Sequence, residues 1–147
     1  MSPEQVKKFV QLFNTMINKP SIDIADEIFT PRFTAHVPMM PVLTCLGYKS
    51  FMQGFQSSFP DFRQEIHDTI ASDNRIVLRL TYYGTQQGGF LGIPATGFEV
   101  SMPAISIFRI EDDLIVENWM EMDILGVIGQ ISKLSPLTSD GYLQSAN

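Results

Sequence analysis

The stretch from residue 105 to residue 131 constrains the fold more than any other part of this chain. Polar and apolar residues alternate on both sides of Asp112 and Asp113, as expected of two strands joined by a tight turn. The second strand runs from Leu114 to about Met122, and residues 124–134 then carry apolar side chains at helical spacing. The chain is therefore predicted to end in an antiparallel hairpin followed by a short helix.

One face of this second strand has an unusual composition. It carries Glu117, Trp119 and Glu121 and continues to Asp123, so the only tryptophan of the chain stands among carboxylates. A solvated face would be rich in Lys and Glu, and a core face would be apolar. The mixture is typical of a pocket wall, where apolar surface surrounds a few polar groups.

Helices come before most of the strands in the rest of the chain. Periodic apolar residues predict three helices, at residues 3–18, 21–29 (capped by Ser21 or Asp23) and 49–59. Alternating patterns predict strands at residues 33–37, 62–72, 75–83 and 98–110, with a glycine-rich loop before the last. This order predicts an α+β fold, a cone-shaped barrel of three N-terminal helices packed in the concave face of a curved, mostly antiparallel sheet.

Length and composition indicate a single domain over residues 1–147, with a core from about residue 6 to residue 134 and a frayed tail at 135–147. The net charge of −6 and the lack of a basic patch argue against a nucleic-acid partner. No apolar run is long enough for a membrane helix, and the N-terminus does not resemble a signal peptide. We therefore expect a cytoplasmic protein.

The sequence predicts neither a metal nor a cofactor. The single cysteine, Cys45, excludes an internal disulfide and a cysteine-based zinc cluster. The two histidines are far apart in the sequence, and no third joins them as a ligand. Phosphate-binding and dinucleotide-binding fingerprints are both missing from the sequence.

Three motifs give the chain a resemblance to a known family. They are GT–x–x–G–x–F–x–GIP–x–TG from Gly84 to Gly97, Arg79 within its strand, and E–x–W–x–x–x–D at Glu117, Trp119 and Asp123. With the FPDF run at residues 59–62, they resemble the SnoaL-like polyketide cyclases (ester cyclases) of the nuclear-transport-factor-2-like superfamily. The resemblance extends from about residue 6 to residue 134 and implies the same cone-shaped α+β fold.

The resemblance also implies an activity, cofactor-free ring closure of a polyketide ester by an aldol reaction, or an isomerisation. Asp123 would be the catalytic residue, because one carboxyl in an apolar pocket can act as both base and acid. The alternative for Asp123 is structural, since it directly precedes a helix and could be its N-cap. The substrate would be a small hydrophobic molecule. Members of the superfamily commonly dimerise through the sheet, so the resemblance also implies a homodimer or higher homo-oligomer.

Six further residues are candidates for substrate binding: His36, Phe51, Phe55, Arg79, Gln86 and Trp119. Each has a structural alternative. The phenylalanines and the tryptophan could pack in the core, His36 could be structural, and Arg79 could pair with Glu99 or Glu117. Gln86 stands where the family often has a histidine, so it could donate a hydrogen bond but could not transfer protons.

Two other functions remain open at the level of sequence. The cone could be a non-catalytic binding pocket for a small molecule, a hypothesis that Gln86 favours. The chain could also be an interaction protein that dimerises through the outer face of its sheet, with a vestigial pocket. A carboxylate buried in the cone would favour the enzyme, and an Asp123 that only caps its helix would favour the binding protein.

Overall fold

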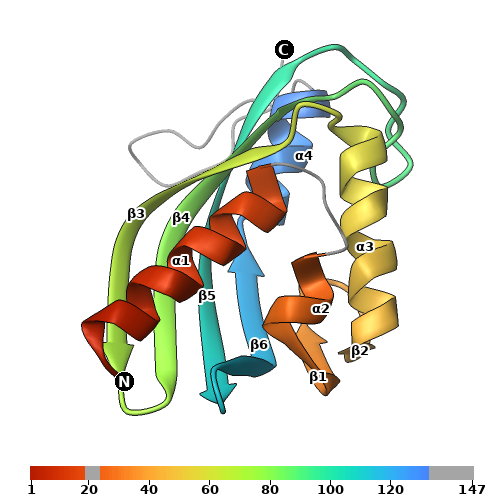
Figure 1. The fold of residues 1–147 in the computed structure, drawn as a ribbon. Coiled ribbons are helices and arrows are strands. Elements are labelled where there is room, and N and C mark those ends of the chain that lie inside the picture. The colour runs from red at the N-terminus through yellow and green to blue at the C-terminus, as the bar shows by residue number, and fades with distance from the viewer. Residues whose placement is uncertain (19–23, 133–147) are drawn as a thin grey trace.

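The computed structural model describes residues 1–18 and 24–132 and shows a six-stranded sheet partly wrapped by helices (Figure 1). In chain order the elements are α1 (Pro3–Asn18), α2 (Ala25–Ile28), β1 (Phe29–His36), β2 (Leu43–Thr44), α3 (Cys45–Ser58), β3 (Arg63–Ser72), β4 (Arg75–Thr85), β5 (Glu99–Glu111), β6 (Leu114–Met122) and α4 (Ile124–Ser132). The predicted α+β class is confirmed.

The sheet has the strand order β2-β1-β6-β5-β4-β3. Strands β3 to β6 form an antiparallel meander with long, nearly continuous register, whereas β1 joins β6 in parallel. The hairpin turn between β5 and β6 lies at Asp112 and Asp113, as predicted, and both residues have positive φ. Aspartate tolerates this left-handed conformation better than most residues, which explains the polar break in an apolar pattern.

Helices α1 and α3 cover the concave face of the curved sheet (Figure 1). Phe9 and Phe13 of α1 pack edge-on against Phe108 of β5, with ring centroids 5.0 and 4.9 Å apart. Phe29 and Phe33 of β1 pack in the same manner against Tyr48 of α3. These aromatic contacts attach both helices to the sheet and leave the space between the helices, above β4 to β6, for a cavity.

Two elements begin four residues before their predicted start. Helix α3 begins at Cys45 instead of Lys49, because the Thr44 hydroxyl accepts a hydrogen bond from Gly47 N–H (3.2 Å) and caps an earlier turn. Strand β1 begins at Phe29 and runs through Pro31, which was expected only to stop a helix. The proline falls in an irregular part of the β1–β6 pairing, where a missing N–H disturbs little.

Some predictions fall on residues that the structure does not describe, and one element of the structure was not predicted. Ser21 and Asp23, the predicted caps of the second helix, and the tail at 135–147 lie outside the described residues. The short strand β2 was not predicted. In residues 1–18 and 24–132, no helix combines the length and the apolar character needed to cross a membrane.

Candidate functional site

The strongest candidate site is a cavity between α3 and the concave face of the sheet. Its outer hollow has a volume of about 130 Å³, and a narrower inner hollow has about 10 Å³. The two are adjacent, because they share four wall residues, Phe51, Phe55, Met120 and Met122. An empty volume near 150 Å³ holds one benzene ring, so the outer hollow fits a single small ring as it stands.

Helix α3 presents an aromatic face to this cavity. Tyr48, Phe51, Met52 and Phe55 recur at helical spacing and all line the inner hollow. The ring centroids of Phe51 and Phe55 lie 5.1 Å apart, and both side chains also line the outer hollow. The structure therefore places these two predicted residues at the cavity, and their contact with a substrate stays a prediction.

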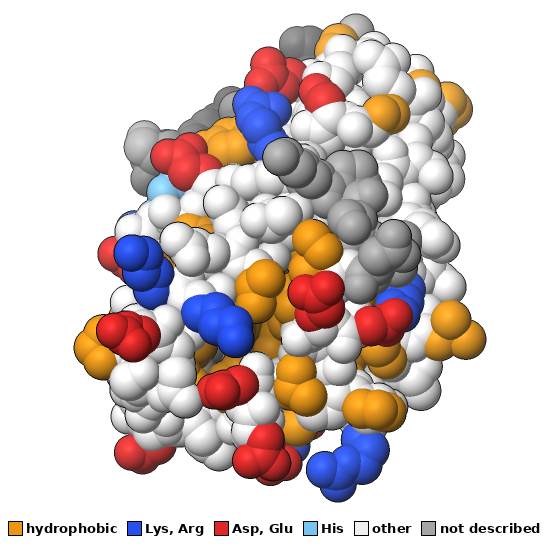
Figure 2. Space-filling view, viewed as in Figure 1, with side chains coloured by type: hydrophobic (Ala, Val, Ile, Leu, Met, Phe, Trp, Pro, Cys, Tyr) orange, Lys and Arg blue, Asp and Glu red, His pale blue; other side chains and the backbone are white. Residues whose placement is uncertain are grey.

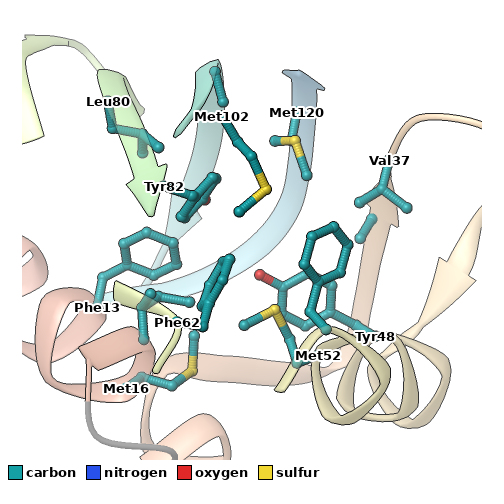
Figure 3. Close-up of a cluster of buried hydrophobic side chains, with 14 of the residues drawn as sticks. Phe13, Met16, Val37, Tyr48, Met52, Phe62, Leu80, Tyr82, Met102 and Met120 are labelled. Atoms are coloured by element: carbon teal, nitrogen blue, oxygen red, sulfur yellow. The ribbon is translucent and has the colours of Figure 1, made fainter. Parts of the chain in front are cut away.

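Four polar side chains converge on the inner hollow within otherwise apolar walls. They are the buried side chains of Tyr48, Tyr82, Ser106 and Asn118. Figure 3 shows the Tyr48 hydroxyl directed between Met52 and Phe62, toward the middle of the side-chain cluster. The Asn118 amide donates a hydrogen bond to the Ile107 carbonyl (3.1 Å), which holds its side chain in place.

The two tyrosines are set up to donate hydrogen bonds. Burial raises the pKa of Tyr48 well above its ordinary value of 10.0. Burial, and then the nearness of Tyr48, raises the pKa of Tyr82 in the same direction. Both hydroxyls therefore keep their protons at neutral pH and can donate to a ligand oxygen, but neither is suited to act as a base.

The mouth of the outer hollow is made by two loops and the start of α4. The loop after β1 contributes Pro38, Met39 and Met40, and the glycine-rich loop contributes Phe90 and Leu91. Ile124 completes the rim. Every one of these side chains is apolar, so the opening favours an apolar molecule.

A separate hollow of about 50 Å³ lies beside α1. Its apolar walls include Phe9, Leu12 and Ile28, and the exposed Lys8 and Glu27 stand at its edge. Figure 2 shows apolar side chains gathered in a hollow on this face, with acidic and basic side chains around them. Its charged groups are exposed to water, whereas the polar groups of the interior cavity are buried. The interior cavity is therefore the better candidate for ligand binding.

The strand face that carries Trp119 does not line the interior cavity, although its Glu121 and Asp123 line an open groove on the other side of the sheet. Asn118, Met120 and Met122 line the cavity, and Glu117, Trp119 and Glu121 alternate with them, so they point to the opposite face of the sheet. Sequence periodicity separated the two faces correctly. It could not tell which face the helices would cover.

On this outer face, Trp119 and His36 belong to a polar cluster. The two rings stack with centroids 5.4 Å apart, and Arg75 lies 5.7 Å from the Trp119 ring. His36 Nε2 lies 2.8 Å from one oxygen of Glu117, and Arg109 donates to the other at 3.2 Å. The structure thus brings His36 and Trp119 together away from the cavity, and their predicted role in substrate binding stays untested.

Arg79 also lies on the outer face, but with a partner that was not predicted. Its guanidinium binds the Asp68 carboxylate (2.6 Å) on the neighbouring strand, whereas Glu99 pairs with Arg63 and Glu117 with Arg109. An open groove of about 380 Å³ runs past Arg79 and reaches Asp123. The structure therefore places these two predicted residues along one groove.

Asp123 is exposed at the start of α4 and caps that helix. Its carboxylate accepts a hydrogen bond from Gly126 N–H at 2.9 Å. A Cβ on residue 126 would collide with that carboxylate in its capping position, so glycine at 126 makes room for the cap. The neighbours Met122 and Ile124 line the cavity, but the Asp123 carboxylate as placed here does not.

Comparison with known proteins agrees with this geometry. The family model of the SnoaL-like polyketide cyclases matches residues 7–131. The chain belongs to this family. No curated protein is similar enough to the chain to match.

Solved structures of similar fold include members from several bacteria. TsrD from Streptomyces laurentii has 28% sequence identity and a TM-score of 0.82, over 91% of this chain and 99% of TsrD. AclR from Streptomyces galilaeus, a candidate hydroxylase, has 22% identity and a TM-score of 0.83, over 95% and 88%. IdmH from Streptomyces antibioticus, a candidate polyketide cyclase, has 23% identity and a TM-score of 0.78, over 87% and 99%. The last two likenesses show the shared fold.

In this SnoaL-like chain the glycine-rich motif holds its own loop together. The Gln86 side chain is fully buried, donates to the Ile93 carbonyl (3.0 Å) and accepts from the Thr96 hydroxyl (2.8 Å) and N–H (3.2 Å). Asp61 of the FPDF run accepts from the Thr85 N–H (2.6 Å) and hydroxyl (2.8 Å). Gln86 therefore supports the loop that carries Phe90 and Leu91, and in this conformation it does not reach the cavity.

Sequence reasoning missed the polar lining of the cavity. Ser106 and Asn118 are polar residues on strand faces that are otherwise apolar, which is the signal that could have revealed them. Tyr48 precedes the predicted start of its helix, so its place on the aromatic face was not recognised. In the described part of the chain, no group of three or more His, Cys, Asp or Glu side chains is arranged to hold a metal ion.

Proposed function

We propose that the chain binds an apolar, oxygen-bearing small molecule in the cavity between α3 and the sheet, and catalyses a cofactor-free cyclisation or isomerisation of it. The observation that carries this proposal is that two buried tyrosines, Tyr48 and Tyr82, line the inner end of an otherwise apolar cavity. Membership of the SnoaL-like polyketide cyclase family supports a cyclase-type or hydroxylase-type activity.

In an aldol ring closure, a base removes a proton beside one carbonyl and the resulting enolate carbon attacks a second carbonyl. A carbon–carbon bond forms, and the alkoxide produced takes a proton. The Tyr48 and Tyr82 hydroxyls would donate hydrogen bonds to the oxygen that becomes negative, which stabilises the transition state. This assignment uses them in the protonated form that their raised pKa values favour.

Asp123 is the proposed base and proton donor. Its carboxylate would have to leave the Gly126 N–H and turn toward the mouth of the cavity. Met122 and Ile124, on either side of Asp123, line the outer hollow, so the backbone of Asp123 lies at its edge. The side chain would have to swing there from the outer-face groove that it lines in this structure. Release of one exposed capping hydrogen bond costs about 1 kcal/mol, which substrate binding can offset.

Two substitutions separate the cap from the chemistry. Asp123→Asn keeps a good N-cap but removes the acid/base group, whereas Asp123→Ala removes both. We expect both variants to lose turnover of aromatic polyketide esters by at least about 100-fold. Only the Ala variant should also lose stability, by about 1 kcal/mol in urea unfolding. Full turnover in Asp123→Asn would remove Asp123 from the mechanism.

A non-catalytic binding protein is the second candidate. It is favoured by the exposure of Asp123, whose carboxylate caps α4, and by the burial of Gln86 where the family often has a histidine. The same assays distinguish the two functions. Binding of the esters without conversion by the native protein would support the binding protein, and conversion that depends on Asp123 would exclude it.

A further inference from the structure

The two turns at the mouth of the cavity contain residues that their backbone conformations disfavour. In the described part of the chain, five residues other than glycine have positive φ. Three are aspartates at hairpin turns, which tolerate this conformation. The other two, Met39 (φ 66°) and Leu91 (φ 49°), are large and apolar, and both line the outer hollow.

Met39 occupies the third position of a four-residue turn. Met40 N–H donates to the Val37 carbonyl (3.4 Å), and Pro38 stands at the second position. Proline followed by a residue of positive φ is the pattern of a type II turn, where glycine or asparagine is normal at the third position. A methionine there costs stability, and its side chain is 71% exposed, so the core gains little from it.

Leu91 shows the same conflict in a different turn. Phe90 and Ile93 exchange two backbone hydrogen bonds of 2.9 Å around Leu91 and Gly92, and both central residues have positive φ. This is the pattern of a type I′ turn, whose first central residue is normally Asn, Asp or Gly. Leu91 is 47% exposed, so here too an apolar side chain is held at the surface against the local preference.

Two residues at the mouth of one cavity thus adopt backbone conformations that their side chains disfavour. Such conflicts are expected mainly at functional sites. The outer hollow of about 130 Å³ fits one small ring, and a larger ligand must extend through the mouth. We propose that Met39 and Leu91 are specificity-determining residues that contact an apolar part of the ligand at the mouth of the cavity. The ligand class is thus an amphiphile, with an oxygen-bearing ring inside and an apolar extension between these two turns.

This inference rests on the proposed binding function, and a matched pair of ligands separates the two. Phenol fits the cavity alone, and 4-hexylphenol adds a tail that must leave through the mouth. The test is an NMR titration of both ligands into the native protein, Met39→Asn, Leu91→Asn and the double variant. Leu46→Asn is the control, because Leu46 is 75% exposed on α3 and is not a lining residue of the outer hollow.

We expect the tail to increase affinity at least about 10-fold in the native protein, because most of a hexyl chain leaves water. Each single variant should reduce that gain by roughly 3-fold, and the double variant should remove most of it. Because the gain is the ratio of the two affinities measured in the same variant, any change in phenol affinity itself cancels. Leu46→Asn should keep the full gain. Asparagine suits positive φ, so both single variants should also unfold at a higher temperature than the native protein.

If the hexyl tail increased affinity equally in the double variant and the native protein, with phenol still bound, the proposed role of Met39 and Leu91 would be overturned. The binding function would remain intact. Absence of phenol binding to the native protein would instead overturn the binding function and, with it, the inference. If Leu46→Asn reduced the affinity contributed by the hexyl tail as much as the mouth variants do, the tail would be adsorbing unspecifically. That result would also overturn the proposal. The unfolding temperatures confirm that lost affinity does not come from lost folding.

Discussion

Glu117 is the most strongly engaged carboxylate of the outer face. His36 contacts one of its oxygens and Arg109 the other, and the side chain is only 22% exposed. The hydrogen bond from His36 lowers the pKa of Glu117 below its ordinary 4.5, burial opposes this, and Arg109 adds to the lowering. The charged form of Glu117 therefore stabilises the folded protein.

This stabilisation should depend on pH. Because the folded pKa is the lower one, the contribution is complete above about pH 4.5 and is lost as pH falls through the folded value. We expect Glu117→Gln to lower the free energy of unfolding by about 1 kcal/mol at pH 7 and by much less at pH 3. Urea unfolding at both pH values tests this, with Glu121→Gln, an exposed residue of the same strand face, as control. An equal loss at pH 3 and pH 7 would contradict the assignment.

At the residue scale, the sequence predicted which side chains of a strand share a face, but it did not predict which face lines the cavity. It grouped Glu117 with Trp119, and Asn118 with Met120, as the structure does. The direction of sheet curvature and the side that α1 and α3 cover depend on tertiary packing, which a period of two does not encode. The face that carries Trp119 was therefore taken for the wall of the cavity, whereas the buried Asn118 of the opposite face lines it.

At the element scale, the glycine-rich loop depends on one buried side chain. Gln86 makes hydrogen bonds to the Ile93 carbonyl and to Thr96, and these bonds tie together the two ends of the turn that carries Phe90 and Leu91. Gly84 permits the loop to start close to the core, because a Cβ there would lie 2.7 Å from the Cβ of Phe59. The loop is thus a fixed part of the cavity mouth.

Removal of the Gln86 amide should be costly. Gln86→Leu keeps the volume but removes the acceptor of the Thr96 N–H and hydroxyl, and it leaves the Ile93 carbonyl with Phe90 N–H as a donor. We therefore expect a loss of about 2–4 kcal/mol in unfolding free energy. Gln87→Leu is the matched control, because its neighbouring side chain is exposed and should change stability by less than about 0.5 kcal/mol. Similar losses in the two variants, measured by urea unfolding, would show that the buried amide is not what holds the loop.

Most elements could be predicted because each carries its own periodic signal. Helix α1 and the meander from β3 to β6 follow the predicted order, with boundaries shifted by a few residues at most. The exceptions depend on contacts with neighbouring strands. Strand β2 has two residues and exists only because β1 lies beside it, and β1 continues through Pro31 because β6 pairs with the residues on either side.

At the scale of the whole molecule, the fold produces one buried space with both apolar walls and polar groups. Helix α3 contributes the aromatic wall and Tyr48, while β4, β5 and β6 contribute Tyr82, Ser106 and Asn118. No single element contains enough of these residues to reveal the site, so only the assembled fold brings the hydroxyls together. Family membership says which fold to expect, but the polar lining belongs to this chain's own residues.

The central claim is that the Tyr48 and Tyr82 hydroxyls hold the oxygen of an apolar ligand. The most direct test is an NMR titration of phenol and toluene, which have nearly the same shape, into the native protein and the Tyr48→Phe, Tyr82→Phe double variant. We expect the native protein to bind phenol roughly 3- to 10-fold more tightly than toluene, which is the value of about one net hydrogen bond. The double variant should lose this preference and keep its toluene affinity. Equal preference for phenol in both proteins would contradict the claim.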